Sequence, residues 1–252
     1  MNRYLLLMNV FFSLLGSIDQ PQSNNNKKSP IRNLTPVTKS YAAENIASKT
    51  NGVHHLTDFV PKGYIIAEKI YGDLNKDNLE DCIIIIKGTD KKRFVKDKYR
   101  GELDRNRRGI IVLFKSKNGY ELAVKNYDCF SSENEDGGVY FAPELDLKID
   151  KGNLYIHYAH GRYGYWEYTF RFQHSDLELI GYDESDSRGP VVNSETSINY
   201  LTKKKIFKEN TNANAESDGE EVFKTTGTKI NMARLIKLSE IKDFDKLDVP
   251  GI

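Results

Sequence analysis

The residues with the clearest chemistry form one short acidic loop. Oxygen-bearing side chains recur at alternate positions in Asp73, Asn75 and Asp77, and Asp81 follows at position nine. Calcium takes six to eight oxygen ligands at roughly 2.3–2.6 Å, and alternate residues of a tight loop point inward. Leu79, at position seven, would add its backbone carbonyl. The spacing therefore predicts a site in which these five residues bind one calcium ion as a structural cofactor.

The sixth position of the loop tests this interpretation. Most calcium loops carry Gly there, whereas this chain has Asn78, which tolerates the left-handed backbone better than other non-glycine residues. An EF-hand is excluded, because its twelfth position would be Ile84 instead of Glu and no helical pattern flanks the loop. The alternative is an acidic turn whose Asp and Asn side chains cap backbone N–H groups.

With its flanking apolar runs, the loop resembles a single FG-GAP/VCBS-type repeat. The resemblance covers Ile65 to Tyr120 and rests on the run Gly72–Asp77, followed by Asp81 and several isoleucines. Such repeats are strand–calcium loop–strand units of integrin-like propellers and bacterial surface proteins. The motif occurs once, so a propeller is not expected. The remainder resembles bacterial exported, lipoprotein-like proteins of unknown function. The resemblance implies metal ligands at Asp73, Asn75, Asp77, Leu79 and Asp81.

Aromatic residues supply a weaker candidate site. Tyr163 and Tyr165 lie in a tyrosine-rich stretch whose exposed rings would stack on a glycan or anchor a partner. Trp166, Tyr168 and Phe170 follow at every second position, which favours one inward face of a strand. We therefore predict that these three rings are buried.

No catalytic motif is present. The sequence lacks G-x-S-x-G, the P-loop pattern and H-E-x-x-H. His157 and His160 would point to opposite faces of a regular strand, which argues against a shared zinc site. Acidic residues in predicted loops at 133–136 or 183–186 leave a cell-envelope hydrolase as an alternative.

The N-terminal segment predicts export. Arg3 precedes an apolar run from Leu5 to Leu15, and Gly16 and Ser17 supply the small residues of a signal peptidase site. Residues 1–17 are therefore assigned to a signal peptide. Ser17 stands where a lipoprotein signal would have its Cys. Residues 18–40, rich in Pro, Asn and Ser, form a predicted flexible linker. We expect a protein that is periplasmic, secreted or associated with the envelope, with no transmembrane segment in the mature chain.

Composition limits the partners and the fold. The 252 residues are 38% hydrophobic and 11% aromatic, and the formal net charge is +1. This near-neutral balance provides no overall field for nucleic acid. Cys82 and Cys129 are the only thiols, and their pairing is left open because facing geometry cannot be read from sequence.

Short runs with a period of two, bounded by turn residues, predict many strands. They favour a mainly β domain over residues 41–252, as an antiparallel sandwich or a partly closed barrel or meander with at most one or two short helices. A short helix is expected within 41–56, and 88–108 and 209–221 are expected to be loops. Strands are predicted at 64–70, 82–86, 109–115, 120–127, 145–149, 154–158, 166–172 and 177–182, with 197–201 and 228–236 as edge strands or, for the last, a helix.

These observations together predict an exported β-domain that binds or supports a partner, carries one structural calcium and has no catalytic activity. The expected partner is an envelope protein or a glycan. The alternatives are the hydrolase and a glycan-binding module built on the tyrosine-rich strand.

Overall fold

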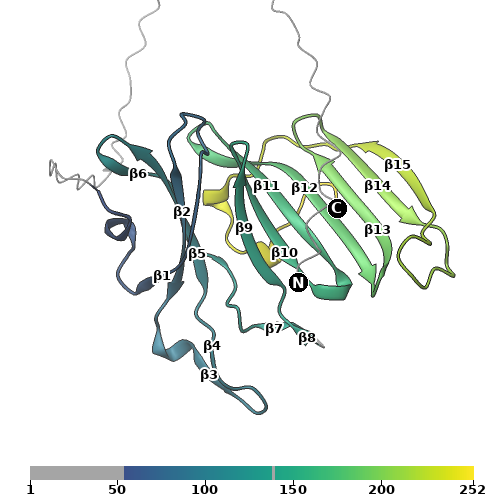
Figure 1. Cartoon of the computed structure of the whole chain (residues 1–252), viewed down its shortest axis with the longest axis horizontal. Helices are drawn as coiled ribbons and strands as arrows, with labels where there is room; N and C mark the ends of the chain where they lie inside the picture. The colour runs from purple at the N-terminus through teal and green to yellow at the C-terminus, as the bar shows by residue number, and fades with distance from the viewer. Residues whose placement is uncertain (1–53, 138–139) are drawn as a thin grey trace, which may run out of the picture. The chain divides into compact units, whose positions relative to one another are not determined.

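The computed structural model describes residues 54–137 and 140–252 (Figure 1). These residues form two main antiparallel sheets. The four-stranded sheet has the order β1-β2-β5-β6, and the seven-stranded sheet runs from β15 back to β9 with each strand beside its neighbour in sequence. The first contains β1 (Tyr64–Gly72), β2 (Asp81–Gly88), β5 (Arg108–Ser116) and β6 (Gly119–Phe130). The second contains β9 (Glu144–Asp150), β10 (Asn153–Ala159), β11 (Gly164–Gln173), β12 (Asp176–Arg188), β13 (Val191–Asn199), β14 (Lys204–Asn210) and β15 (Phe223–Lys229).

The remaining elements are short. Two small hairpins occur, β3 (Phe94–Asp97) with β4 (Gly101–Asp104), and β7 (Asp136–Gly137) with β8 (Tyr140–Phe141). The helical elements in the described part of the chain are single 3₁₀ turns: η1 (Leu56–Phe59), η2 (Lys91–Arg93), η3 (Gly161–Tyr163), η4 (Leu238–Glu240) and η5 (Phe244–Lys246).

The centre of the four-stranded sheet is apolar on both faces. Because side chains alternate along a strand, Ile83 and Ile85 enter a core shared with the second sheet, whereas Ile84 and Ile86 enter a smaller cluster on the opposite face. That smaller cluster is covered by residues of η1 and its neighbours. The unbroken apolar run of β2 therefore reflects burial on both faces of the sheet.

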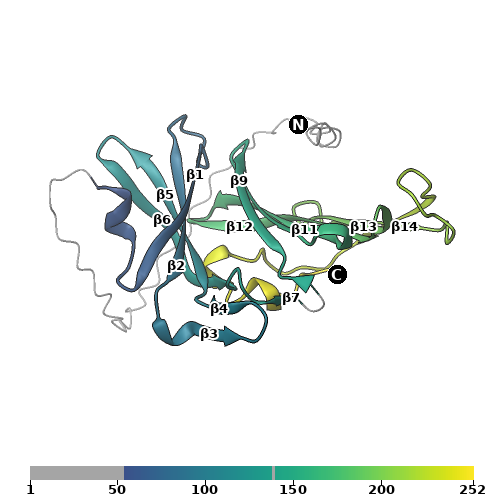
Figure 2. The same cartoon turned by 60° about the horizontal axis from the view of Figure 1, so that its bottom comes forward.

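The seven-stranded sheet supplies the other side of the shared core. Leu154 and Ile156 of β10 and Phe170 of β11 are fully buried there. The C-terminal segment, yellow in Figure 2, returns to the same face and inserts Leu238 and Phe244. We call this side the core face and the opposite side the outer face. The two sheets thus form a sandwich with one principal core.

The fold class was predicted correctly: the described residues form a mainly β, antiparallel sandwich whose seven-stranded sheet is a meander, with only short helical turns. The eight strands predicted between 64 and 182 are present, with the Asn118-Gly119 turn between β5 and β6. Several interpretations were wrong. The predicted edge strand at 197–201 falls mostly within β13, which pairs with both β12 and β14 and is therefore an interior strand. The 88–108 stretch contains the β3–β4 hairpin, and β15 ends at Lys229 and is followed by neither strand nor helix up to η4.

Several predictions lie outside the described residues, namely the signal peptide, the linker and nearly all of the predicted helix at 41–56. The described residues belong to one compact unit. Within residues 54–137 and 140–252, no helix has the length and apolar character needed to cross a bilayer. Cys82 and Cys129 are both buried free thiols on opposite faces of the four-stranded sheet, so they do not form the disulfide that export would permit.

Candidate functional site

The predicted calcium loop connects β1 to β2. Its backbone turns through two left-handed residues, Lys76 with φ 65° and Asn78 with φ 66°. Calcium loops ordinarily place Gly at the sixth position because the backbone there makes a sharp turn. Asn78 adopts the conformation expected for that position, as its residue type predicted.

Three side chains of the loop are turned toward its own backbone. One Asp73 oxygen accepts hydrogen bonds from the N–H groups of Lys76 at 2.6 Å and Asp77 at 3.2 Å, and the other accepts from Asn78 at 3.0 Å. The N–H of Asp77 also donates to Asn75 Oδ1 at 3.0 Å. The N–H of Leu79 donates to Asp77 Oδ1 at 2.8 Å. A carboxylate oxygen has two lone pairs, so these bonds leave acceptor capacity for a cation.

Asp81 has a different role from the other loop carboxylates. It is fully buried, and one oxygen accepts from the N–H of Leu74 at 2.8 Å and from that of Asn75 at 3.4 Å. Its other oxygen accepts from the N–H of Lys115, at the end of β5, at 2.9 Å. Burial raises the pKa of Asp81, and these three hydrogen bonds oppose that shift. Asp81 therefore anchors the loop to the sheet through the backbone of two separate segments.

The loop also contacts the hairpin between β9 and β10. Leu74 is almost fully buried in the shared core. A Cβ added to Gly72 would lie 2.6 Å from an Ile149 side-chain atom, and one added to Gly152 would lie 2.3 Å from the side chain of Lys76. The loop therefore lies where the four-stranded sheet contacts the β9–β10 hairpin of the seven-stranded sheet.

The donor set fits a hard cation in part. Asp73 and Asn75 are partly exposed and Asp77 is exposed, so their oxygens are accessible. Leu79, the predicted backbone ligand, is also exposed. Asp81, by contrast, has both oxygens engaged by backbone N–H groups. Within the described ranges, no three His, Cys, Asp or Glu side chains are grouped closely enough to hold a metal ion. A cation would therefore depend on Asp73, Asn75, Asp77, backbone carbonyls and water.

The predicted aromatic site is less well formed. Tyr163 and Tyr165 are 37% and 39% exposed, but the first lies in η3 and the second on β11, with Gly164 at φ 107° between them. Tyr165 stacks on His157 with ring centroids 5.1 Å apart, on the outer face. The two rings therefore belong to different elements, and nothing in their contacts makes them one flat platform.

The adjacent aromatic row was predicted correctly as core. Tyr168 and Phe170 are buried, and Trp166 is partly buried against the same core. The ring of Tyr158 stacks on Trp166 with centroids 5.3 Å apart and an interplanar angle of 13°. These residues stabilise the sandwich.

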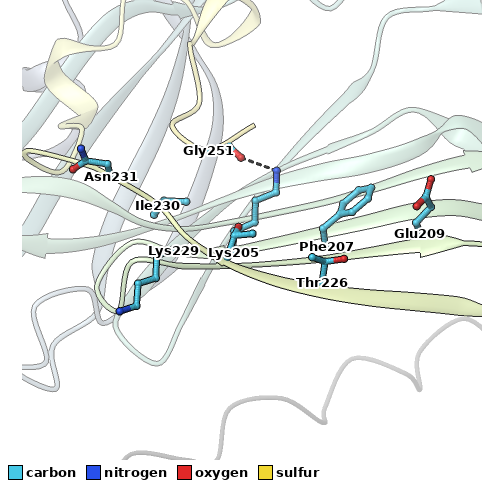
Figure 3. Close-up of a pocket in the computed structure, with 9 residues that line it drawn as sticks. Lys205, Phe207, Glu209, Thr226, Lys229, Ile230, Asn231 and Gly251 are labelled. Carbon is cyan, nitrogen blue, oxygen red and sulfur yellow. Dashed lines mark hydrogen bonds between the residues drawn. The ribbon is translucent and has the colours of Figure 1, made fainter.

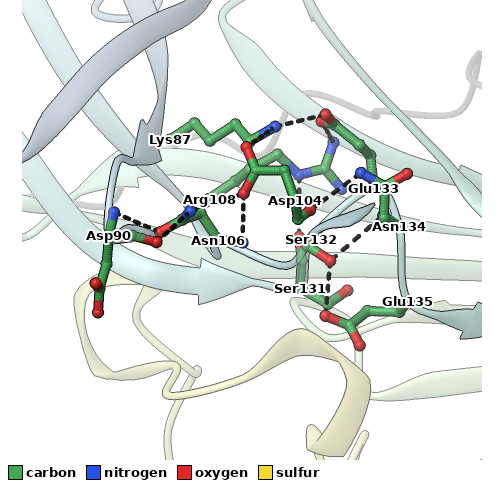
Figure 4. Close-up of polar contacts among 10 residues, drawn as sticks. All are labelled: Lys87, Asp90, Asp104, Asn106, Arg108, Ser131, Ser132, Glu133, Asn134 and Glu135. Carbon is green, nitrogen blue, oxygen red and sulfur yellow. Dashed lines mark hydrogen bonds and ion pairs between the residues drawn. The ribbon is translucent and has the colours of Figure 1, made fainter. Parts of the chain in front are cut away.

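The first acidic segment proposed for a hydrolase lies mostly in a loop, as predicted, and two of its carboxylates are engaged in ion pairs. Glu133 forms an ion pair with Lys87 at 2.6 Å, and Asp104 lies 2.8 Å from the same ammonium (Figure 4). Glu135 pairs with Arg105 at 2.7 Å. These contacts hold the β3–β4 hairpin and the 131–135 segment against the four-stranded sheet.

The second acidic segment, 183–186, was wrongly interpreted as a loop. It lies within β12, and its side chains alternate between the two faces of the sheet. Asp183 faces outward, directly across from Glu167 of β11. The sequence did not indicate this juxtaposition, because it depends on strand register.

A hollow lies on the core face of β14 and β15. It has a volume of about 630 Å³, with Phe207 and Thr226 on its floor (Figure 3). The ammonium of Lys205 donates to the carbonyl of Gly251 at 2.6 Å, so the C-terminal tail closes one end. The groove is open, and one of its cationic groups is already engaged by the chain itself.

Comparison with protein-family models, with curated proteins and with solved structures found no match for this chain.

Proposed function

We propose that this chain is an exported binding or structural β-domain whose 73–81 loop takes up one calcium ion. The observation that supports the calcium proposal most is the left-handed backbone of Asn78 at the sixth position of the loop. It occurs in a turn where Asp73, Asn75 and Asp77 direct oxygens toward a common stretch of backbone. This combination provides the sharp turn and the oxygen donors that calcium loops use.

In this proposal the ligand set is narrower than the sequence predicted. Asp73, Asn75 and Asp77 supply side-chain oxygens and Leu79 a backbone carbonyl, while water completes the shell. Asp81 positions the loop from its base. Because the loop packs beside the β9–β10 hairpin, ordering it stabilises the contact between the two sheets. The ion is structural, and the surfaces of the sandwich are left for a partner such as an envelope protein or a glycan.

The calcium proposal is tested by thermal unfolding of the full chain with excess calcium, with a chelator and with magnesium. A ligand that binds only the native state raises stability by RT ln(1 + [L]/Kd), about 2.7 kcal/mol at a hundredfold excess over Kd. We expect Tm to rise with calcium, to fall with chelator and to respond weakly to magnesium, which demands a smaller octahedral shell.

Two variants identify the site. Asp77→Ala should abolish the calcium response. Asp97→Ala is the matched control, because Asp97, like Asp77, accepts hydrogen bonds from backbone N–H groups in a turn but lies outside the loop. Its donors are Tyr99 at 2.8 Å and Arg100 at 2.7 Å. This variant should retain the full response. Identical wild-type Tm values with calcium and with chelator would leave the loop as an acidic turn only.

Export has a separate test. We expect the mature protein recovered from the cell envelope to lack residues 1–17, which intact-mass measurement would detect. Soluble cytosolic protein that retains Met1 would contradict this part of the proposal.

A further inference from the structure

The outer face of the seven-stranded sheet carries a row of polar residues that cross five strands. The strand register places Asp146 opposite His157, His157 opposite Glu167, Glu167 opposite Asp183, and Asp183 opposite Ser197. Two carboxyl groups thus occupy directly opposed positions on β11 and β12. Like charges in directly opposed positions destabilise a sheet.

Glu167 is the more confined of the two carboxyl groups. It is only 7% exposed, and its Oε2 lies 3.3 Å from Nδ1 of His157. Burial raises the pKa of Glu167, and the charge of Asp183 raises it further, whereas Lys148 and His157 oppose the shift. The single imidazole contact therefore does not offset burial beside a second carboxylate.

Burial is also the main influence on the pKa of Asp183. Burial raises its pKa, and a hydrogen bond from the Ser197 hydroxyl partly opposes the shift. The titratable and charged groups of the outer face around this pair include Asp146 and Lys148 on β9, Tyr155 and His157 on β10, Tyr165 on β11 and Glu195 on β13. Glu195 is itself paired with Lys208 at 2.8 Å.

From this arrangement we propose that Glu167 and Asp183 form a proton-binding pair that makes the seven-stranded sheet more stable at mildly acidic pH than at neutral pH. One proton on the pair removes the repulsion between opposed carboxylates and the unfavourable burial of one charge. The device lies on the seven-stranded sheet and does not depend on calcium in the 73–81 loop.

The direction of the effect follows from proton linkage. Since both pKa values are raised in the folded chain, the folded chain binds more protons than the unfolded chain between about pH 4 and the raised values. The free energy of unfolding therefore increases as pH falls through this window. Carboxyl groups with lowered pKa values, such as Glu135 and Glu178, decrease the free energy of unfolding as pH falls. Their effect begins only as the pH approaches the ordinary pKa range of carboxyl groups, about 4.

The experiment is a series of thermal melts of the full chain, with chelator, from about pH 4.5 to about pH 7.5. The wild-type Tm should rise as pH falls. Burial also raises the pKa of Asp81, so Asp81 contributes to the pH dependence of the wild-type Tm as well. The contribution of the pair is therefore measured as the difference between the wild-type curve and the Asp183→Asn curve. Asp183→Asn should have the higher Tm at neutral pH and a clearly smaller rise on acidification.

Asp186→Asn is the control, because Asp186 is an exposed aspartate on the same strand with its side chain on the other face. It should follow the wild-type curve. Parallel curves for wild type and Asp183→Asn would overturn the proposal.

Carbon-13 NMR titration of side-chain carboxyl groups in the wild-type chain gives a test that needs no variant to fold. We expect at least one Glu and one Asp signal to titrate above the ordinary range of about 3.9–4.3 and to shift together. If every Glu carboxyl titrated within or below that range, the proposal would fail.

Discussion

The acidic loop and the outer sheet face surround their carboxylates with different numbers of hydrogen-bond donors. In the loop, Asp73 accepts three backbone N–H groups, and Asp81, although fully buried, also accepts three. On the sheet, Glu167 has one imidazole contact and faces Asp183 across the strand pair. At Asp81, backbone donors oppose the effect of burial, although its pKa is still raised, whereas at Glu167 the charge of Asp183 adds to the effect of burial.

Asp81 and Asp183 are the same residue type, but their surroundings give them different roles. A buried carboxylate is tolerated when enough donors surround it, and it favours protonation when a second carboxylate lies opposite. The same residue type therefore serves as an anchor at position 81 and as half of a proton-binding pair at position 183.

The largest expected effect is at Asp81. Asp81→Ala would leave the N–H groups of Leu74 and Lys115 buried without an acceptor, and each unsatisfied donor costs about 1–3 kcal/mol. We expect a loss of about 3 kcal/mol or more in the free energy of unfolding, both with calcium and with chelator. Urea denaturation under the two conditions would measure it. A loss seen only with calcium would make Asp81 a metal ligand instead of an anchor.

A smaller effect of opposite sign is expected at Asp183. At neutral pH, Asp183→Asn removes the charge opposite Glu167 and should raise the free energy of unfolding by about 1 kcal/mol or less. Urea denaturation at neutral pH would detect the gain. A loss of stability at that pH would show that the hydrogen bond with Ser197 outweighs the repulsion.

The smallest expected effect is at Asp77 without calcium. This side chain is exposed and accepts two hydrogen bonds, from the N–H of Leu79 and from the side-chain amide of Asn75. Because both bonds are exposed to solvent, Asp77→Ala should cost only about 0.5–1 kcal/mol in chelator. Chemical denaturation would distinguish this from the effect at Asp81. Comparable losses of stability for Asp77→Ala and Asp81→Ala would contradict the distinction between Asp77 as an accessible oxygen donor and Asp81 as a buried anchor.

The sequence predicted those features that depend on local pattern. Apolar alternation located β9 to β11, and residue type predicted the left-handed Asn78. Strands without an apolar period were missed: β3 and β4 are short, and Phe94 and Val95 in β3 are exposed.

The candidate sites also differ in whether their residues are contiguous in the sequence. The loop is contiguous in sequence, so its donors could be named. The Glu167–Asp183 pair depends on register across two strands and on the irregularity between Thr169 and Phe170, which spacing alone does not reveal. Likewise, the role of Asp81 depends on Lys115, which lies 34 residues away in the chain.

The most direct test of the central claim is isothermal titration of calcium into the full chain after removal of divalent cations. We predict saturable binding of one ion per chain, and its loss in Asp73→Ala. Absence of saturable binding in wild-type protein that is folded by circular dichroism would contradict the calcium proposal.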